Sequence, residues 1–314
     1  MSKKIISVVT PCYNEEDSVR ECITTLRTIF ATHLPNYGLE HIFCDNCSTD
    51  RTVDILKEEA LKDSGIKIIV NSRNFGILKN TYNGVMAATG DAVVLFMPVD
   101  LQDPPELIPD FVKHWESGFE IVYGIRAVRE EGFLLRMARK GYYRLLSRLS
   151  YIDYPPDAGD FQLVDRQVLN AMKKVDDAQP FMRMMTFDSG FKSIGVSYTW
   201  RQRKHGVSRN KLFSMFEQGL NGIISFSSMP VRAALILGML TSIISVLYAV
   251  YVILITLFGN ITTLPGIPTI IVAMFFFGGV QLFFLGIVGE YVLAIFNQVR
   301  HKPLVVERER VNFD

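Results

Sequence analysis

Apolar and polar positions follow two alternating patterns through roughly the first 200 residues of the chain. Short apolar runs that end in turn residues are typical of strands, and each is followed by apolar positions three and four residues apart, which are typical of an amphipathic helix. The expected strands cover residues 4–14, 39–45, 66–70, 91–97 and 119–124, and the expected helices begin near Glu15, Ser48, Ile77 and Pro105, with Ser48 as an N-cap. Strands and helices that take turns predict a Rossmann-like α/β domain with a mostly parallel sheet and helices on both faces.

The pattern changes in the last third of the chain, where no Asp, Glu, Lys, Arg or His occurs between Ala233 and Gly289. This interval holds two apolar segments of about 20 residues or more, separated by the Gly- and Pro-rich residues 259–268. Both segments would be apolar on all sides as helices, which disfavours a pair of soluble amphipathic helices. The sequence therefore predicts a transmembrane hairpin with spans at about 231–258 and 268–295.

These patterns divide the chain into four parts. We expect a cytoplasmic domain over 1–209, an amphipathic interfacial segment over 210–230, the hairpin over 231–298 and a cytoplasmic tail over 299–314. No cleavable signal peptide is expected at the start, because the first apolar run is short and becomes acidic. Basic residues on both sides of the hairpin place both termini in the cytoplasm and predict a multi-pass protein of the inner (plasma) membrane.

Charge and cysteine content exclude two other classes of function. The formal net charge of +1 argues against nucleic acid as a partner. Cys44 and Cys47 have CxxC spacing, but the five histidines offer no matching pair, so a zinc site is not expected.

An apolar strand runs directly into a loop that carries Asp100, Gln102 and Asp103 and ends at Pro104 and Pro105. Their oxygens are hard ligands that suit Mg²⁺ or Mn²⁺ and, through the ion, a diphosphate. A second interpretation stays open for Asp103, because Asp before two prolines is also typical of a helix N-cap.

Polar clusters follow four of the expected strands, at residues 11–15, 45–50, 72–76 and 98–103. Ligands of parallel α/β sheets bind beyond the carboxyl ends of the strands, so we expect these clusters to form one site.

Seven segments in fixed order carry a resemblance to a known family: SVVTPCYNEEDSV, DNCSTDRT, SRNFG, ATGDAVVLF, VDLQDPPELI, AGDFQLVDR and GVSR. With the two apolar spans that follow, they resemble the family 2 GT-A glycosyltransferases that act on polyprenyl phosphates, a group that includes bactoprenol glucosyltransferases and dolichyl-phosphate mannose synthase. The resemblance covers nearly the whole chain. It implies a GT-A fold and inverting transfer of one sugar from a nucleotide sugar to a polyprenyl phosphate, such as undecaprenyl phosphate, at the cytoplasmic membrane face.

The resemblance also implies a nucleotide-sugar site, with Asp45 at the position of the carboxylate that reads the nucleobase. Its expected residues are Pro11, Tyr13, Asn14, Glu15, Asp45, Arg73 and Asn74. UDP-glucose is the favoured donor, while UDP-galactose, UDP-N-acetylhexosamines and GDP-mannose stay open. The chain departs from the family at Pro98, where relatives commonly carry the first Asp of a D-x-D metal motif, and after residue 76, where relatives often carry KEAA.

Transfer from a nucleotide sugar builds negative charge on the leaving diphosphate, which a divalent ion stabilises. The acceptor phosphate has its second pKa at about 6, so it brings an anionic nucleophile and needs no strong general base. The expected catalytic residues are Asp100 at the metal and Asp157 and Asp160, which match the family's acidic segment and which we expect to orient the acceptor.

An anionic acceptor calls for cationic side chains, and guanidinium groups pair with phosphate oxygens through two nitrogens. The candidates for the acceptor phosphate are Arg126, Arg139, Lys140, Arg203, Ser208 and Arg209, of which Arg203 and Ser208 match the family's phosphate-binding segment.

Two other functions are weighed against this one. A processive polysaccharide synthase is disfavoured because two spans are few for a conduit and no Q-x-x-R-W segment is present. A non-catalytic membrane scaffold that kept the fold is suggested by Pro98. The resemblance also implies a homo-oligomer in contact with the lipid bilayer.

Overall fold

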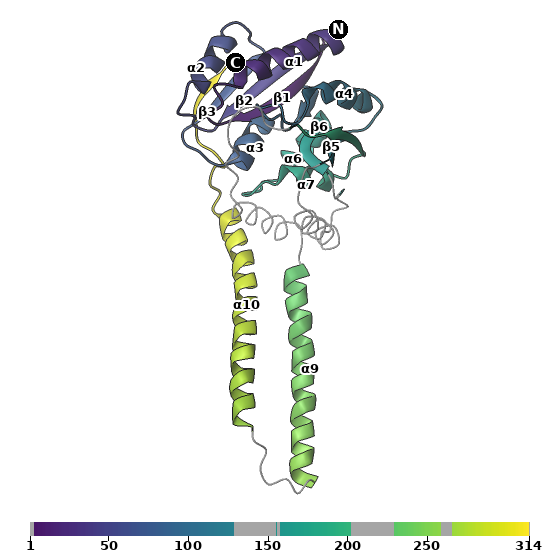
Figure 1. Ribbon diagram of the computed structural model, residues 1–314, viewed down its shortest axis with the longest axis vertical. Helices are drawn as coiled ribbons and strands as arrows, with labels where there is room; N and C mark the ends of the chain where they lie inside the picture. The colour runs from purple at the N-terminus through teal and green to yellow at the C-terminus, as the bar shows by residue number, and fades with distance from the viewer. Residues whose placement is uncertain (1–2, 129–154, 156–157, 202–228, 259–265, 314) are drawn as a thin grey trace. The chain divides into compact units, whose positions relative to one another are not determined.

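The computed structural model describes residues 3–128, 155, 158–201, 229–258 and 266–313 (Figure 1). One compact unit contains the described residues up to Arg201 together with residues 301–313, and a second unit contains two long apolar helices.

The first unit is built on an eight-stranded sheet, among the described residues, with strand order β7-β5-β6-β4-β1-β2-β3-β8. The strands are β1 (Lys4–Cys12), β2 (Tyr37–Asp45), β3 (Ile66–Asn71), β4 (Ala92–Val94), β5 (Ile121–Val128), β6 (Ala158–Asp165), β7 (Ser193–Thr199) and β8 (Glu307–Val311). β1 pairs in parallel with β2 and β4, β2 with β3, and β5 with β7. β6 and β8 pair antiparallel with their neighbours. The prediction of a mostly parallel sheet is confirmed.

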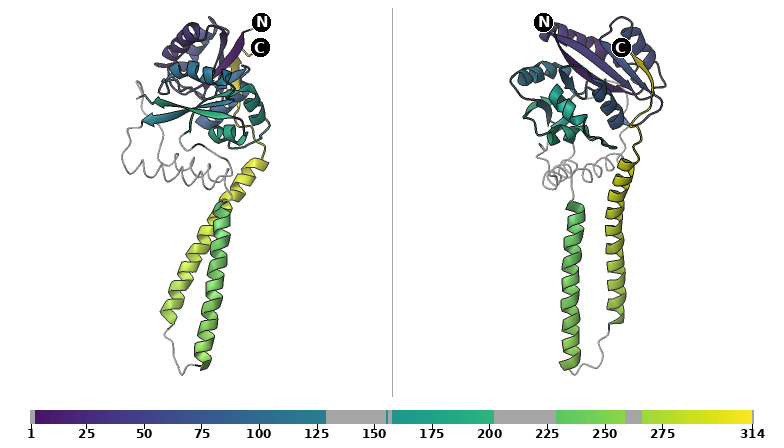
Figure 2. Two further views of the ribbon diagram at one scale, coloured as in Figure 1. Left: turned by 90° about the vertical axis from the view of Figure 1, so that its right-hand side faces the viewer. Right: turned by 180° about the vertical axis from the view of Figure 1, so that it is seen from behind.

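β4 is shorter than the strand expected over 91–97, although Leu95 and Met97 still hydrogen-bond to backbone oxygens of β6 and β1. β8 comes from the segment that the sequence analysis treats only as a tail. It lies beside β3 at the edge of the sheet, drawn in yellow in Figures 1 and 2.

The helices of this unit lie on both faces of the sheet, as the pattern predicts. They are α1 (Val19–His33), α2 (Thr52–Ala60), α3 (Ile77–Ala87), the 3-10 helix η1 (Pro105–Leu107), α4 (Ile108–Glu116), α6 (Arg166–Met172) and α7 (Met182–Asp188). Phe43 belongs to the core cluster that α1 and α2 share, while its neighbour Cys44 faces α3. Successive residues of a strand point to opposite faces, so α3 lies opposite α1 and α2. A Cβ at Gly84 of α3 would lie 2.0 Å from the Cys44 sulfur, so this close approach requires glycine.

α1 shows why the periodic pattern folds in this way. Its buried positions Val19, Ile23, Leu26 and Phe30 recur every three or four residues and are at most 5% exposed. Burying such a side chain contributes about 1.5 to 3 kcal/mol, so this stripe fixes the helix on the sheet.

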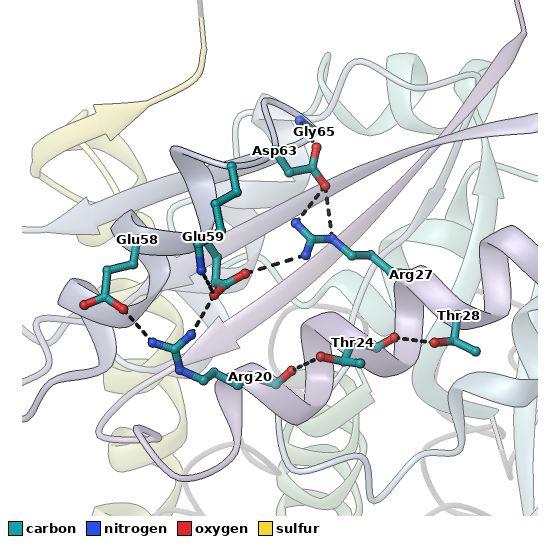
Figure 3. Close-up of polar contacts among 9 residues, drawn as sticks. Arg20, Thr24, Arg27, Thr28, Glu58, Glu59, Asp63 and Gly65 are labelled. Atoms are coloured by element: carbon teal, nitrogen blue, oxygen red, sulfur yellow. Dashed lines mark hydrogen bonds and ion pairs between the residues drawn. The ribbon is translucent and has the colours of Figure 1, made fainter.

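An ionic network joins α1 to α2 at the surface. In Figure 3, Arg20 and Arg27 of α1 point toward Glu58, Glu59 and Asp63, with Arg20–Glu59 at 2.6 Å and Arg27–Asp63 at 2.9 Å. Exposed pairs of this kind are worth about 1 kcal/mol or less each. Glu59 is the buried member of the network, and the hydrogen bond from Lys62 is the largest cause that lowers its pKa. The network therefore joins the two helices at the surface and contributes little to the stability of the fold.

The second unit consists of α9 (Met229–Phe258) and α10 (Ile267–Val299). Within the described residues, one stretch is long and apolar enough to cross a membrane, namely Phe276–Val299 in α10, with a mean hydropathy of 1.9. Val231–Ser245 in α9 is apolar over a shorter length. Both predicted spans are helical, and their joint arrangement as a membrane hairpin stays a prediction.

Candidate active site

The loops after β1 and β2 hold each other at the carboxyl edge of the sheet. Cys12 and Asp45 are register partners at the ends of these parallel strands. Beyond them, the Asn14 amide donates to the Ser48 hydroxyl at 2.9 Å, the Thr49 amide donates to the Asn14 side chain at 2.8 Å, and the Glu15 amide donates to Thr52 at 2.8 Å. Asn14 itself has a φ of 55°, a conformation that Asn tolerates better than most residues. The first two predicted clusters therefore form one interlocked surface.

Asp45 lies beneath this surface with 0% exposure. One of its oxygens accepts the Ser48 amide at 2.9 Å, and the other accepts the Ser48 hydroxyl. Burial raises the pKa of Asp45, and the hydrogen bonds from Ser48 oppose that rise. Because Ser48 is engaged in this way, it does not cap a helix, and α2 begins only at Thr52, whose amide bonds to Asp50 at 3.0 Å. The expectation of Ser48 as the N-cap is wrong.

A chain of asparagine side chains holds the loop of residues 72–76. Asn46 donates to Asn74 at 2.9 Å and accepts from the Phe75 amide at 2.9 Å. Asn71 donates to Asn80, which donates to the Cys44 carbonyl at 2.7 Å. Sequence reasoning chose Asn74 for the site but did not single out Asn71 at the end of β3 or Asn80 in α3, which are both buried.

Arg73 and Asn74 reach the surface of the same loop. The Arg73 guanidinium lies 3.9 Å from the centre of the Phe75 ring and donates to the Asn74 carbonyl at 3.0 Å. The loop thus carries a cation, and Asn46 joins it to the loop after β2 through the bond to Asn74. Pro11 lies buried in β1, and Tyr13 and Glu15 are partly exposed beside it.

The predicted metal loop follows β4 as a tight turn. Its Leu101 amide donates to the Pro98 carbonyl at 3.0 Å with a φ of 57° at Leu101, and the Gln102 amide donates to the Asp100 carboxylate at 3.3 Å. Asp100 and Gln102 are partly exposed on this turn. No group of three or more His, Cys, Asp or Glu side chains that could hold a metal occurs in the described part of the chain. A divalent ion here would thus combine Asp100 and Gln102 with water and phosphate oxygens, which suits Mg²⁺.

Asp103 points into the protein and is 1% exposed. One of its oxygens accepts the Tyr198 hydroxyl, and the other pairs with Arg126 at 3.1 Å. The 3-10 helix that follows has Pro104 at its N-cap position and no side-chain cap. The alternative interpretation of Asp103 as a helix cap is therefore wrong. Its carboxylate instead binds Arg126 of β5 and Tyr198 of β7.

Arg126 links this cluster to the other half of the sheet. Its Nε donates to the Tyr198 hydroxyl at 3.0 Å, and its guanidinium lies 5.5 Å from the centre of the Trp200 ring. Burial opposes the charge of Arg126, but Asp103 and then Tyr198 outweigh it, so the pKa of Arg126 is raised. The Arg201 amide also donates to the Gln102 carbonyl at 3.0 Å. The end of β7 and the residues after it therefore hold the predicted metal loop in place. The contacting residues are about a hundred positions apart in the sequence, so no local pattern predicts the contact.

Asp160 extends from β6 toward α7, where it forms a two-point ion pair with Arg183, one bond of which measures 2.8 Å from Nε. Its negative charge is thus balanced by a cation that sequence reasoning did not select. The other candidates on this side, Asp157, Arg139, Lys140, Arg203, Ser208 and Arg209, lie outside the described residues.

Comparisons with known proteins agree with this arrangement. The model of the family described as Glycosyl transferase family 2 matches residues 7–172. The uncharacterized glycosyltransferase YkcC of Bacillus subtilis (strain 168) is 37% identical over 308 residues, which cover 98% of this chain and 94% of that protein. The bactoprenol glucosyl transferase of Shigella phage SfV is 32% identical over 308 residues, covering 97% of this chain and 99% of that protein.

A solved structure shares the fold. Glucosyl-3-phosphoglycerate synthase from Mycobacterium tuberculosis, in complex with Mn²⁺, UDP and phosphoglyceric acid, is similar with a TM-score of 0.50 at 22% sequence identity, covering 71% of this chain and 78% of that chain. The likeness supports a GT-A-like α/β fold.

Proposed function

Because this chain belongs to glycosyl transferase family 2 and is a glycosyltransferase, we propose that it transfers one sugar from a nucleotide sugar to a polyprenyl phosphate. UDP-glucose is the favoured donor and undecaprenyl phosphate the favoured acceptor. The observation that carries the proposal is the end-to-end likeness to a bactoprenol glucosyl transferase, which covers 97% of this chain and 99% of that protein. A likeness confined to the first 172 residues would have left the acceptor open.

The donor is proposed to bind over the loops that follow β1, β2 and β3. The residues proposed for this site are Pro11, Tyr13, Asn14, Glu15, Asp45, Arg73 and Asn74. Asn14 and Arg73 border the surface on which a nucleoside diphosphate would lie, and the Arg73 cation suits its negative charge. Asp45 has both carboxylate oxygens engaged by Ser48, so its contribution to nucleobase recognition is to fix the turn that faces the base.

A divalent ion, Mg²⁺ or Mn²⁺, fits the oxygen donors of Asp100 and Gln102. When bound, such an ion neutralises the charge that develops on the departing diphosphate. Asp103 is the third residue that the sequence predicts for this ion. Since its oxygens pair with Tyr198 and Arg126, we now assign Asp103 to holding the loop that presents Asp100 and Gln102.

The acceptor phosphate is proposed to approach from the side of β5. Two guanidinium nitrogens of Arg126 are held by Asp103 and Tyr198, while its Nη1 makes no hydrogen bond within the described residues. We assign that nitrogen to a phosphate oxygen of the acceptor. An anionic oxygen of the phosphate then attacks the anomeric carbon as the bond to the diphosphate breaks on the opposite side, which inverts the anomeric configuration.

Acidic and basic residues around the acceptor complete the proposal. Asp160, whose charge is balanced by Arg183, orients the acceptor or its counter-ions in preference to removing a proton. Asp157, Arg139, Lys140, Arg203, Ser208 and Arg209 keep the roles that the resemblance implies.

The lipid acceptor is consistent with an enzyme at the membrane. We propose that α9 and α10 form a hairpin in the inner membrane, with the catalytic unit and both termini in the cytoplasm, and that residues 210–230 lie at the interface. A homo-oligomer is proposed on the resemblance alone.

The test is an incubation of purified, detergent-solubilised protein with a panel of labelled nucleotide sugars and undecaprenyl phosphate. Label should enter the organic phase from UDP-glucose, and only when the lipid phosphate is present. Label in a water-soluble or insoluble polymer would favour a processive synthase. The absence of any nucleotide-sugar binding would favour a non-catalytic scaffold.

A further inference from the structure

The C-terminal strand β8 lies outside the residues that the family model matches, yet it completes the sheet of the catalytic unit. It pairs antiparallel with β3, with Val311 opposite Ile68 and Glu309 opposite Val70. At the end of β3 the register shifts, so that Glu307 lies opposite Asn71. A β-bulge of this kind redirects the side chains that follow it, because neighbouring positions of a strand otherwise alternate between faces.

The register shift sends two glutamates of one short strand to different helices. Glu309 pairs with Lys57 of α2 at 2.6 Å, on the face that carries the ionic network of Figure 3. Glu307 accepts a hydrogen bond from Asn83 of α3 at 2.6 Å, on the opposite face. Glu307 also pairs with Arg310 at 2.5 Å, and this hydrogen bond is the largest cause that lowers the pKa of Glu307. The carboxylate that reaches α3 is therefore ionised at neutral pH.

The contacts of this segment continue onto the proposed donor loop of residues 72–76. The Ser72 amide donates to the Val306 carbonyl at 2.8 Å, and Arg308 reaches the Ser72 carbonyl at 3.5 Å. α3 begins at Ile77, directly after the loop. The C-terminal segment thus holds the loop at its first residue and, through Asn83, also holds the helix into which the loop runs. The Asn46 side chain, directly after β2, hydrogen-bonds to Asn74 and Phe75 of the same loop.

We infer that residues 306–308 are positioning residues for the nucleotide-sugar donor, because they hold the first residue of the loop that carries Arg73 and Asn74 and also hold the helix that follows this loop. The inference rests on the proposed function for the identity of the donor. It assigns to a segment after the apolar helices a role in donor binding, whereas the acceptor phosphate is proposed to contact β5.

Two matched substitutions in β8 separate this role from general stabilisation. Glu307→Ala removes the contact to α3 together with the pair to Arg310 within the same segment, and Glu309→Ala removes an ion pair of similar length to α2. Donor affinity is measured on the full chain in detergent by titrating UDP-glucose without acceptor, and the KM for undecaprenyl phosphate is measured at saturating donor. Glu307→Ala should weaken donor binding by about 5- to 10-fold, the scale of one lost charged hydrogen bond, and leave the acceptor KM within about 2-fold. Glu309→Ala should leave both constants within about 2-fold.

Hydrogen exchange of residues 72–76 gives a readout that does not depend on the donor. Exchange in this loop should be faster in Glu307→Ala and in Asn83→Ala, with no further increase in the double variant, and unchanged in Glu309→Ala. Equal effects of Glu307→Ala and Glu309→Ala on donor affinity and on exchange would overturn the inference while leaving the proposed function intact. Failure of the unaltered protein to bind any nucleotide sugar would overturn both.

Discussion

Replacing Tyr198 by phenylalanine removes one oxygen atom from the buried cluster that holds the metal loop. The Tyr198 hydroxyl donates to Asp103 and accepts from Arg126 at 3.0 Å, and the Tyr198 side chain is 5% exposed. Burial and the neighbouring Asp103 carboxylate raise the pKa of Tyr198, so the hydroxyl stays protonated and can donate throughout the working pH range. In the variant, Asp103 and Arg126 keep their own ion pair at 3.1 Å but lose the group that bridges them.

The magnitude follows from the kind of bond that is lost. A hydrogen bond to a charged group contributes about 1.5 to 3 kcal/mol, and here two such bonds share one hydroxyl, so the free energy of unfolding should fall by about 2 to 3 kcal/mol. The pair that remains should keep the fold intact. Since Asp103 directly follows Gln102, loosening it should also raise the Mn²⁺ concentration for half-maximal transfer by about 10-fold, which corresponds to about 1.4 kcal/mol.

The assay combines thermal unfolding in detergent with initial rates over a Mn²⁺ titration at saturating donor and acceptor. Tyr123→Phe is the matched control, because Tyr123 is a buried tyrosine of β5 whose hydroxyl makes no hydrogen bond within the described residues. Tyr123→Phe should change the metal requirement by less than about 2-fold. The same metal requirement in both variants, together with an equal loss of stability, would refute the assignment of the cluster to positioning the metal loop.

Three further predictions address the metal, the pH dependence and the topology. Asp100→Asn should leave the thermal unfolding temperature nearly unchanged and reduce the transfer rate by about 10²-fold or more, and full activity in this variant or in excess chelator would remove the metal from the mechanism. Burial, and to a smaller extent Arg27, lowers the pKa of His41 to about 3 from 6.5. Below pH 6.5 the unfolded chain therefore binds a proton that the folded chain does not. The free energy of unfolding falls as the pH falls from 6.5 toward about 3. His41→Gln should therefore reduce the loss of unfolding free energy between pH 6.5 and about 4.5 by about 2 to 3 kcal/mol, measured by urea titration, and an unchanged pH slope would contradict this account. Reporters fused before Met1 and after Asp314 should both read cytoplasmic, and a periplasmic signal from either would exclude the hairpin.

Much of the fold could be predicted because its signals are local. The stripe of Val19, Ile23 and Leu26 predicts α1, and polar clusters directly after strands predict which loops meet at the carboxyl edge of a parallel sheet. The parts that could not be predicted depend on contacts between distant residues. β8 has the sequence ERERV, whose charges do not indicate a strand, and it pairs with the edge strand β3 from about 240 residues earlier.

The site shows the same division. Asp100, Asn14 and Asn74 could be chosen from their places after strands. Asp103 could not be interpreted correctly, because two prolines after an Asp also occur at helix starts and its true partners, Arg126 and Tyr198, arrive from β5 and β7. Arg183 gave no signal at all, since only the folded chain brings it to Asp160.

The central claim is that one sugar is attached to a lipid phosphate, and the lipid product tests it most directly. Purified protein is incubated with UDP-glucose, undecaprenyl phosphate and Mn²⁺, and the extracted lipid is analysed by mass spectrometry and by the proton coupling at the anomeric carbon. The account predicts a mass gain of a single hexosyl group, an anomeric configuration opposite to that of the donor and one UDP released for each lipid converted. Unmodified lipid with UDP released into water, or a ladder of longer products, would contradict it.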